Sequence, residues 1–233
     1  MKLTQDLQSY QDKRRFPNWQ PKKPETQRIT NGNDAIVQRC LHFLPLELQV
    51  GDWCTTQQEL PPGVQEFLTR NAEDESKHDI VLKMLADYYC VGDISDEANR
   101  LLDQWRALDC NPVLAAYTLE MGVFFSILPT LIKHGDVYAA TVAQWINDDE
   151  RVHVETNLRI IRELKLKITK ELAALVYNTV VYIYSPLGAD AAKANGQRAV
   201  KRLLSGKDEQ MLTDSLPVTI AFFEQHDKRA IVY

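Results

Sequence analysis

Two short motifs of the same composition carry the residues of this chain that are best suited to chemistry. They are Glu75-Ser-Lys-His78 and Glu150-Arg-Val-His153, and each places a carboxylate and an imidazole three residues apart. Residues with this spacing lie on one face of an α-helix, so both side chains of a motif can reach one metal ion. Carboxylates with imidazoles, and without thiolates, suit iron or manganese better than zinc, copper or magnesium.

A lone glutamate precedes each motif at a matched distance. Glu47 lies 28 residues before Glu75, and Glu120 lies 30 residues before Glu150. Each half of the chain therefore contains a glutamate, about thirty residues, and then Glu-x-x-His, which is a ligand set for two metals inside a helical bundle. We expect two iron ions, or a manganese and an iron ion. The six expected ligands are Glu47, Glu75, His78, Glu120, Glu150 and His153.

Signals for chain breaks lie midway between the paired glutamates. The midpoint of the first pair falls on Pro61-Pro62, and that of the second falls on Gly135. Two antiparallel helices joined at such a midpoint place both residues of a pair at one height, roughly 20 Å from the turn at 1.5 Å per residue. Pro45 disturbs the helix that carries Glu47, so Asp52 and Glu59 compete with it as ligands.

The surroundings of these acidic residues are apolar at helical spacing. Val113, Tyr117 and Val123 flank Glu120, and Phe43 and Val50 flank Glu47, so the carboxylates face the core. Four carboxylates that face one another in a dry interior repel strongly unless cations lie between them. Two divalent metals resolve that conflict.

An aspartate precedes each motif, at Asp74 and Asp149. A histidine that binds a metal usually donates its other N–H group to a carboxylate. Across the bundle, Asp149 is placed to accept from His78, and Asp74 from His153.

The apolar periodicity predicts an all-α chain with no convincing strand. Asn111-Pro112 and Gly135-Asp136 mark helix boundaries, because Asn and Asp cap helices and Pro fits the first turn. The expected helices are 34–57 with a kink at Pro45, 63–90, a short helix at 96–108 within a crossover, 112–133, 137–164, 168–185, 190–204 and 208–224, followed by a tail at 228–233.

The chain divides into an arm and one domain. Residues 1–32 are polar, with three prolines and a basic cluster, and predict an extended N-terminal arm that lies on the surface or binds a partner through its charges. Residues 33–233 predict a single helical domain. Its metal-binding four-helix core spans 33–164, and additional helices span 165–233.

With these ligands and aspartates, residues 34–164 resemble the ferritin-like diiron-carboxylate superfamily in pattern, not in close sequence similarity. The resemblance implies a ferritin-like four-helix bundle with additional C-terminal helices. Glu47 and Glu120 would be the lone helix ligands, and Glu75 and Glu150 bridging or terminal carboxylates. His78 and His153 would be the imidazole ligands.

Departures from the pattern distinguish members of the superfamily. Leu82 stands where ribonucleotide reductase small subunits carry a radical tyrosine, and Phe124 where soluble multicomponent hydroxylases carry a threonine. The chain has no C-x-x-C site as in rubrerythrins, and it is longer than bacterioferritins. Its layout is most similar to that of aldehyde-deformylating oxygenases, which also have helices after the bundle and Asp-Glu-x-x-His in the fourth helix.

The resemblance implies an oxidoreductase that activates dioxygen to oxidise a small apolar substrate, with electrons from an external donor. The alternatives are a ferroxidase or iron-handling protein without an organic substrate, and a structural helical protein with a vestigial site. Gly122, Val123 and Phe124 could line a substrate channel, although ordinary bundle packing is the favoured explanation for most of these residues. Tyr117, one turn from Glu120, could bond a ligand or relay an electron, or be a buried structural tyrosine.

Composition limits the remaining classes. The chain of 233 residues has 45% apolar and 25% charged residues, which is ordinary for a soluble protein. Its net charge of −5 argues against nucleic-acid binding. Four cysteines without C-x-x-C spacing indicate reduced thiols and a cytoplasmic location. We expect neither a secretory signal nor a membrane span, because no apolar stretch is long enough. A homo-oligomer is compatible with the sequence.

Overall fold

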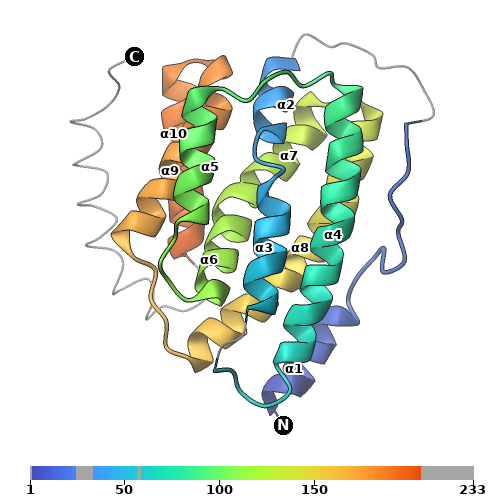
Figure 1. The fold of residues 1–233 in the computed structure, drawn as a ribbon, viewed down its shortest axis with the longest axis vertical. Coiled ribbons are helices and arrows are strands. Elements are labelled where there is room, and N and C mark those ends of the chain that lie inside the picture. Colours follow the sequence, from blue (N-terminus) through green and yellow to red (C-terminus); the bar gives the residue numbers. More distant parts are fainter. Residues whose placement is uncertain (1, 25–33, 57–58, 206–233) are drawn as a thin grey trace.

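The computed structural model describes residues 2–24, 34–56 and 59–205, and every regular element in these ranges is helical, which confirms the all-α prediction (Figure 1). In chain order the elements are α1 (Lys2–Gln11), α2 (Asp34–Leu41), α3 (Leu46–Thr55), α4 (Gln65–Tyr88), α5 (Asp96–Arg106), α6 (Pro112–Leu119), the π-helical turn η1 (Glu120–Phe124), α7 (Phe125–His134), α8 (Val137–Glu163), α9 (Lys170–Tyr184), the 3₁₀ turn η2 (Ser185–Leu187) and α10 (Ala189–Leu204).

Four helices surround a common interior. Helix α3 packs on α4, α4 on α8, α8 on α6, and α6 on α3 (Figure 1). Helices α4 and α8 are long and uninterrupted, with 24 and 27 residues. The interior is lined by fully buried apolar side chains such as Leu68, Ala116 and Ile146. The burial of this apolar surface drives the association of the helices.

Two of the expected helices are interrupted. Residues 34–57 do not form one kinked helix, because turn residues separate α2 from α3 and Pro45 directly precedes α3. Proline has no backbone N–H and its ring clashes with the preceding turn of a helix, so here it ends the first helix and starts the second. The expected helix at 112–133 is interrupted by the π-helical turn η1, which begins at Glu120.

The predicted helix starts at Asn111 and Asp136 are confirmed. The Asn111 side chain accepts a hydrogen bond from the Val113 backbone N–H at 3.0 Å, and Asp136 accepts one from Ala139 at 3.0 Å. Both bonds satisfy N–H groups that have no partner within their own helix.

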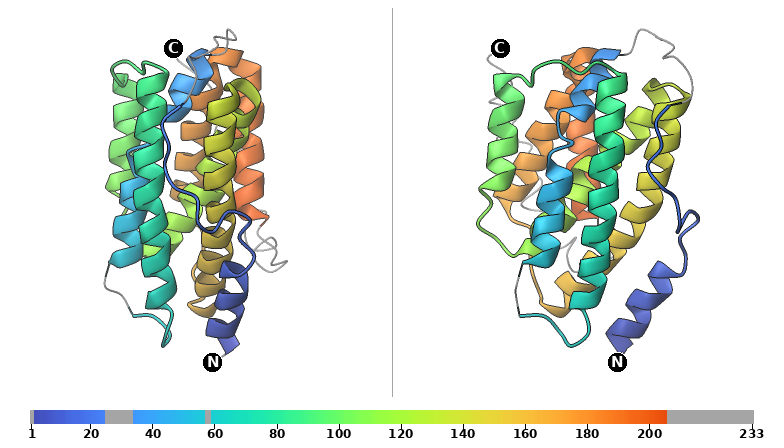
Figure 2. Two further views of the ribbon diagram at one scale, coloured as in Figure 1. Left: turned by 90° about the vertical axis from the view of Figure 1, so that its right-hand side faces the viewer. Right: turned by 45° about the vertical axis from the view of Figure 1, so that its right-hand side comes forward.

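The prediction of an extended N-terminal arm is wrong for residues 2–11, which form helix α1. Leu7 is fully buried where α1 packs against α8, and the Tyr10 hydroxyl accepts a hydrogen bond from Arg159 at 3.1 Å. The short apolar stripe of Leu3, Leu7 and Tyr10 was the overlooked signal. The segment after α1 runs along the molecule beside α4 and α8 (Figure 2). The rest of the predicted arm, residues 25–33, lies outside the described residues.

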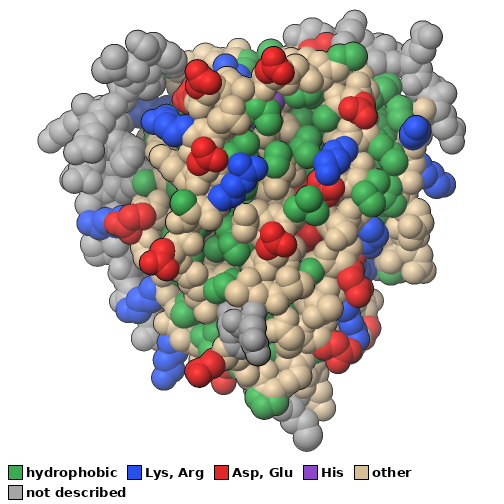
Figure 3. Space-filling model, viewed as in Figure 1, with side chains coloured by type: hydrophobic (Ala, Val, Ile, Leu, Met, Phe, Trp, Pro, Cys, Tyr) green, Lys and Arg blue, Asp and Glu red, His purple; other side chains and the backbone are tan. Residues whose placement is uncertain are grey.

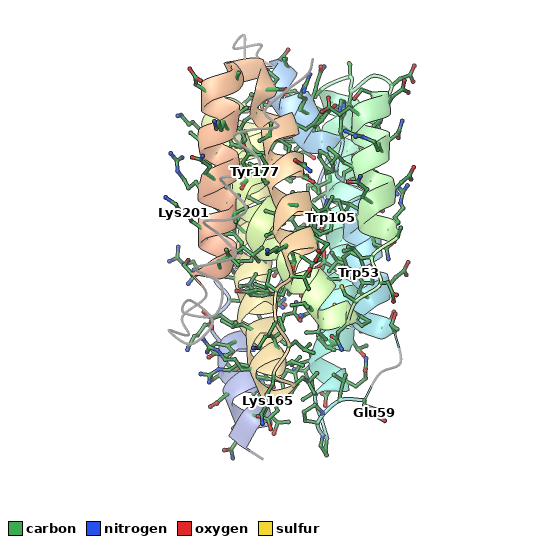
Figure 4. The ribbon with its side chains drawn as sticks, turned by 90° about the vertical axis from the view of Figure 1, so that its left-hand side faces the viewer. Trp53, Glu59, Trp105, Lys165, Tyr177 and Lys201 are labelled. Atoms are coloured by element: carbon green, nitrogen blue, oxygen red, sulfur yellow. The ribbon has the colours of Figure 1, made fainter. Side chains whose placement is uncertain are left out.

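Helices α9 and α10 pack on each other and against η1. Helix α5 lies beside α9, where the Trp105 indole donates a hydrogen bond to the Thr179 hydroxyl at 3.0 Å, whereas Lys201 of α10 points outward (Figure 4). The predicted helix at 208–224 and the tail at 228–233 lie outside the described residues. Additional helices therefore cover the four-helix interior on the side of Glu120.

The expectation that no apolar stretch is long enough to span a membrane is wrong by length and composition, because one helical stretch in the described ranges, Pro112–His134, meets both requirements. Within its most apolar window, 78% is buried inside the protein, as in the core helix of a soluble protein, so it is a weak sign of a span. On the face viewed in Figure 3, acidic and basic side chains are intermixed with apolar ones.

Candidate metal centre

The six predicted ligands converge in the interior of the four helices. Each is 0% exposed except Glu47, which is 2% exposed, whereas the competing Asp52 and Glu59 are exposed at the surface. The six residues form two overlapping groups, and the potential ligand atoms of each group lie within 4.8 Å of one another. One group is Glu47, Glu75, His78 and Glu150, and the other is Glu75, Glu120, Glu150 and His153. Glu75 and Glu150 belong to both groups, so the two groups share a pair of carboxylates.

Both imidazoles direct Nδ1 toward the carboxylates. The Nδ1 atom of His78 lies 3.1 Å from Glu75 Oε2, 3.4 Å from Glu47 Oε2 and 3.5 Å from Glu150 Oε1. The Nδ1 atom of His153 lies 2.9 Å from Glu75 Oε1 and 3.7 Å from Glu150 Oε2. Nδ1 is therefore the nitrogen that each histidine offers to a metal.

The outer nitrogens contact the two aspartates across the bundle. His78 Nε2 lies 3.2 Å from Asp149 Oδ2, and His153 Nε2 lies 3.2 Å from Asp74 Oδ2, which are the two pairings expected from the sequence. An imidazole that donates its Nε2–H group to a carboxylate keeps the Nδ1 lone pair for a metal. The aspartates thus fix the tautomer and the ring orientation.

Glu120 is held by partners that sequence reasoning missed. The Asn157 side chain donates a hydrogen bond to Glu120 Oε2 at 2.9 Å, and its only sequence signal was a polar residue on the apolar face of α8. Glu120 also begins the π-helical turn, in which backbone carbonyls leave the regular pattern. Arg202 of α10 donates to the carbonyl oxygens of Met121 at 2.8 Å and Gly122 at 2.9 Å. Helix α10 therefore supports the turn that presents Glu120.

No space for a substrate lies against the Cα atom of Gly122, one of the residues that the sequence suggested could line a channel. A Cβ atom at this position would lie 2.6 Å from Val176 Cγ2, so α9 already fills the space. Val123 and Phe124 are buried in the apolar core, as ordinary packing requires. Burial raises the pKa of Tyr117 to about 12, and its hydroxyl has no hydrogen-bond partner among the described residues. Tyr117 is therefore a neutral phenol with no bond to the predicted ligands.

The carboxylates differ in their electrostatic environment. Burial, together with the charge of Glu75, raises the pKa of Glu47, and burial with the charge of Glu150 raises the pKa of Glu120. Burial also opposes ionisation of Glu75, but the charges of His78 and His153 outweigh it and lower its pKa below the usual range. In the protein without metal, Glu75 therefore ionises more readily than Glu47 and Glu120.

The histidines show the reciprocal shift. Burial disfavours the imidazolium form, yet the Glu75 carboxylate and the hydrogen bonds to Asp149 and Asp74 raise the pKa of both His78 and His153. In the protein without metal, protons on the two imidazoles therefore compensate part of the negative charge of the surrounding carboxylates.

The donor set fits a pair of divalent metals. Glu120 Oε1 and both carboxylate oxygens of Glu150 are buried and have no hydrogen-bond partner in the described part of the chain. Buried acceptors without partners are costly, and metal ions would satisfy them. Oxygen and imidazole donors suit iron or manganese. Burial and the neighbouring glutamates raise the pKa of Cys54, so its thiol stays neutral and is a poor ligand.

Comparisons with protein-family models, with curated proteins and with solved structures found no match to this chain. The resemblance to the ferritin-like diiron proteins therefore rests on the ligand pattern in the sequence alone.

Proposed function

We propose that this protein is a dinuclear metal oxidoreductase, with two iron ions or a manganese and an iron ion in a ferritin-like four-helix bundle. The observation that carries the proposal is the pair of overlapping buried groups that share Glu75 and Glu150. Isolated acidic clusters are common on protein surfaces, but six buried ligands from four packed helices are costly without cations. The lone glutamates, the two Glu-x-x-His motifs and their arrangement match the ligand set of dinuclear carboxylate bundles.

The chemistry that a bound pair of reduced irons supplies is the activation of dioxygen, with electrons from an external donor. The residues of the chain hold and orient the ligands. Asp74 and Asp149 accept the outer N–H groups of the histidines, so each Nδ1 faces the interior. Asn157 fixes one oxygen of Glu120 and leaves the other free. Complete burial of the six ligands excludes bulk water, which strengthens the electrostatic interactions in the site.

Anaerobic loading with Fe(II) tests the proposal. We expect two irons per chain by metal analysis, a small oligomer by size-exclusion chromatography, and oxygen uptake when a reductant is added. The variant Glu75→Ala should lose both irons, because Glu75 belongs to both groups, whereas Glu73→Gln on the exposed face of α4 should bind as the wild type does. Absence of stoichiometric metal in the wild-type protein would overturn the proposal in favour of a structural helical protein.

A ferroxidase or iron-handling role without an organic substrate is the second candidate. The contact of Gly122 with Val176 favours it, because this contact fills the space beside one of the residues that could line a substrate channel. The same loading experiment separates the two candidates. Hundreds of irons in a large hollow particle, with oxygen uptake that stops when Fe(II) is exhausted, support iron handling. Two irons with sustained uptake in the presence of a reductant support the oxidoreductase.

A further inference from the structure

A buried arginine from the N-terminal segment contacts both aspartates that orient the histidines. Arg14 Nη2 lies 2.6 Å from Asp74 Oδ2, and Arg14 Nη1 lies 3.1 Å from Asp149 Oδ1. The Arg14 side chain is 8% exposed, and the two aspartates are 7% and 0% exposed at their side chains. The planar guanidinium group therefore links helix α4 to helix α8 directly outside the predicted metal ligands.

The same segment makes further contacts at this point. The Trp19 indole donates a hydrogen bond to Asp149 Oδ2 at 2.8 Å and stacks almost parallel to His78, with ring centroids 6.0 Å apart. The backbone N–H of Phe16 donates to Asp148 Oδ2 at 2.9 Å. Residues 14–19 are thus fixed to both long helices of the centre, although at least 55 positions of sequence separate them from Asp74.

We propose that Arg14 is a positioning residue for both metal ions, and that residues 14–19 are a functional part of the centre. This inference rests on the proposed function. Without Arg14, each aspartate would keep its contact with a histidine and one further local contact, Asp74 with Lys77 and Asp149 with Trp19, but no group would join the two carboxylates. The guanidinium group of Arg14 contacts one oxygen of each aspartate and holds both carboxylates in place, so that they accept the Nε2–H groups of His78 and His153 at once.

Lysine cannot replace arginine in this role. A guanidinium group presents several N–H donors in one rigid plane and can contact two carboxylates together, whereas an ammonium group is a compact point charge. Lys77 already provides such a charge, because its Nζ lies 2.6 Å from Asp74 Oδ1, and no contact between Lys77 and Asp149 is seen in the described part of the chain. Charge alone at Asp74 therefore does not join the two aspartates.

Cobalt(II) titration of the full chain tests the proposal, with the ligand-field absorption spectrum and the rate of metal loss to a chelator as readouts. Loss of a group that orients metal ligands typically weakens metal binding by about 10- to 100-fold. We expect Arg14→Met and Arg14→Lys each to weaken the binding of both ions by about 10-fold, to speed metal loss and to change the spectrum. The matched control is Lys13→Gln, which removes a neighbouring exposed cation outside residues 14–19 and should bind as the wild type does.

Trp19→Phe provides a second, milder variant in case the Arg14 variants fold poorly. It keeps an aromatic ring beside His78 but removes the indole donor to Asp149. It should therefore weaken the binding of only one ion, the one held by the group that contains His78. Two cobalt ions per wild-type chain, with unchanged affinity and spectrum in Arg14→Met, overturn the positioning role and leave the proposed function intact. Full rescue by Arg14→Lys also overturns it. Failure of the wild type to bind two ions overturns the proposed function itself.

Discussion

The two halves of the candidate centre are built differently. Helices α4 and α8 are uninterrupted, and each provides a glutamate, a histidine and an aspartate within five consecutive residues. The lone glutamates lie next to interruptions of the regular helices. Glu47 lies in the first turn of α3, directly after the break at Pro45, and Glu120 begins the π-helical turn η1.

This difference separates ligands that are fixed locally from ligands that need distant support. In a regular helix the relative positions of Asp74, Glu75 and His78 follow from the helical repeat alone. The position of Glu120 depends instead on Asn157 of α8 and on Arg202 of α10, which donates to carbonyls of η1. The half of the centre built from the two Glu-x-x-His motifs should therefore tolerate changes in remote packing better than the half built from Glu47 and Glu120.

In the metal-free protein, replacing a single glutamate by glutamine should give the largest difference in the free energy of unfolding between the two halves. Glu75→Gln removes the ionised partner of two buried imidazoles and should lower the free energy of unfolding by about 3 kcal/mol. Glu120→Gln should change it by less than about 1 kcal/mol, because the pKa of Glu120 is already raised and glutamine can still accept from Asn157. Urea denaturation at pH 7 measures both values.

Glu73→Gln on the exposed face of α4 is the control for that series and should leave the free energy of unfolding unchanged. Equal losses from Glu75→Gln and Glu120→Gln would contradict the distinction between the two halves.

The pH dependence of metal binding sharpens the same comparison. The pKa values of His78 and His153 are raised, so both imidazoles keep their protons to higher pH than free histidine does, and a metal must displace them. Metal affinity should therefore rise with pH between about 6 and 8, by up to tenfold per pH unit for each proton released. Chelator competition at several pH values, with calorimetry in two buffers, measures the affinity and the number of protons.

Glu75→Gln also tests the origin of this pH dependence. The Glu75 charge is the largest influence that raises both histidine pKa values, so the variant should show weaker binding and a shallower slope with pH. A slope as steep as that of the wild type would show that Glu75 does not control the imidazole protons.

Replacing Gly122 or Gly51 by alanine tests the packing of the two elements that carry the lone glutamates. This series has the smallest expected effect. In Gly122→Ala the new methyl group would lie 2.6 Å from Val176, so overpacking should cost about 1–3 kcal/mol and disturb Glu120. In Gly51→Ala the methyl group would lie 3.6 Å from Glu75 Cβ, an ordinary contact, and better helix propensity should offset any cost. Thermal unfolding measures the stability of each variant. Adding Val176→Ala to the Gly122→Ala variant should restore its stability. Equal stability of the two alanine variants would contradict the tight contact.

The contacts around the centre show how far sequence reasoning reached. The hydrogen bonds between His78 and Asp149 and between His153 and Asp74 were predicted, because helical spacing and the opposed directions of α4 and α8 determine them. Arg14 and Trp19 were not predicted as neighbours of the site. Their segment has no periodic pattern that specifies a partner, and its position depends on the docking of α1 against α8.

The sequence by itself determined the all-α class, the helix starts at Asn111 and Asp136, and the inward faces of the two motifs. These features follow from backbone hydrogen bonding and from the 3.6-residue repeat, which act within a few turns of chain. Only the tertiary structure decided that Pro45 separates two helices, that Glu120 begins a π-helical turn, and that Val176 fills the space beside Gly122. Those outcomes depend on side chains that meet from distant parts of the chain, and close packing leaves each of them little freedom.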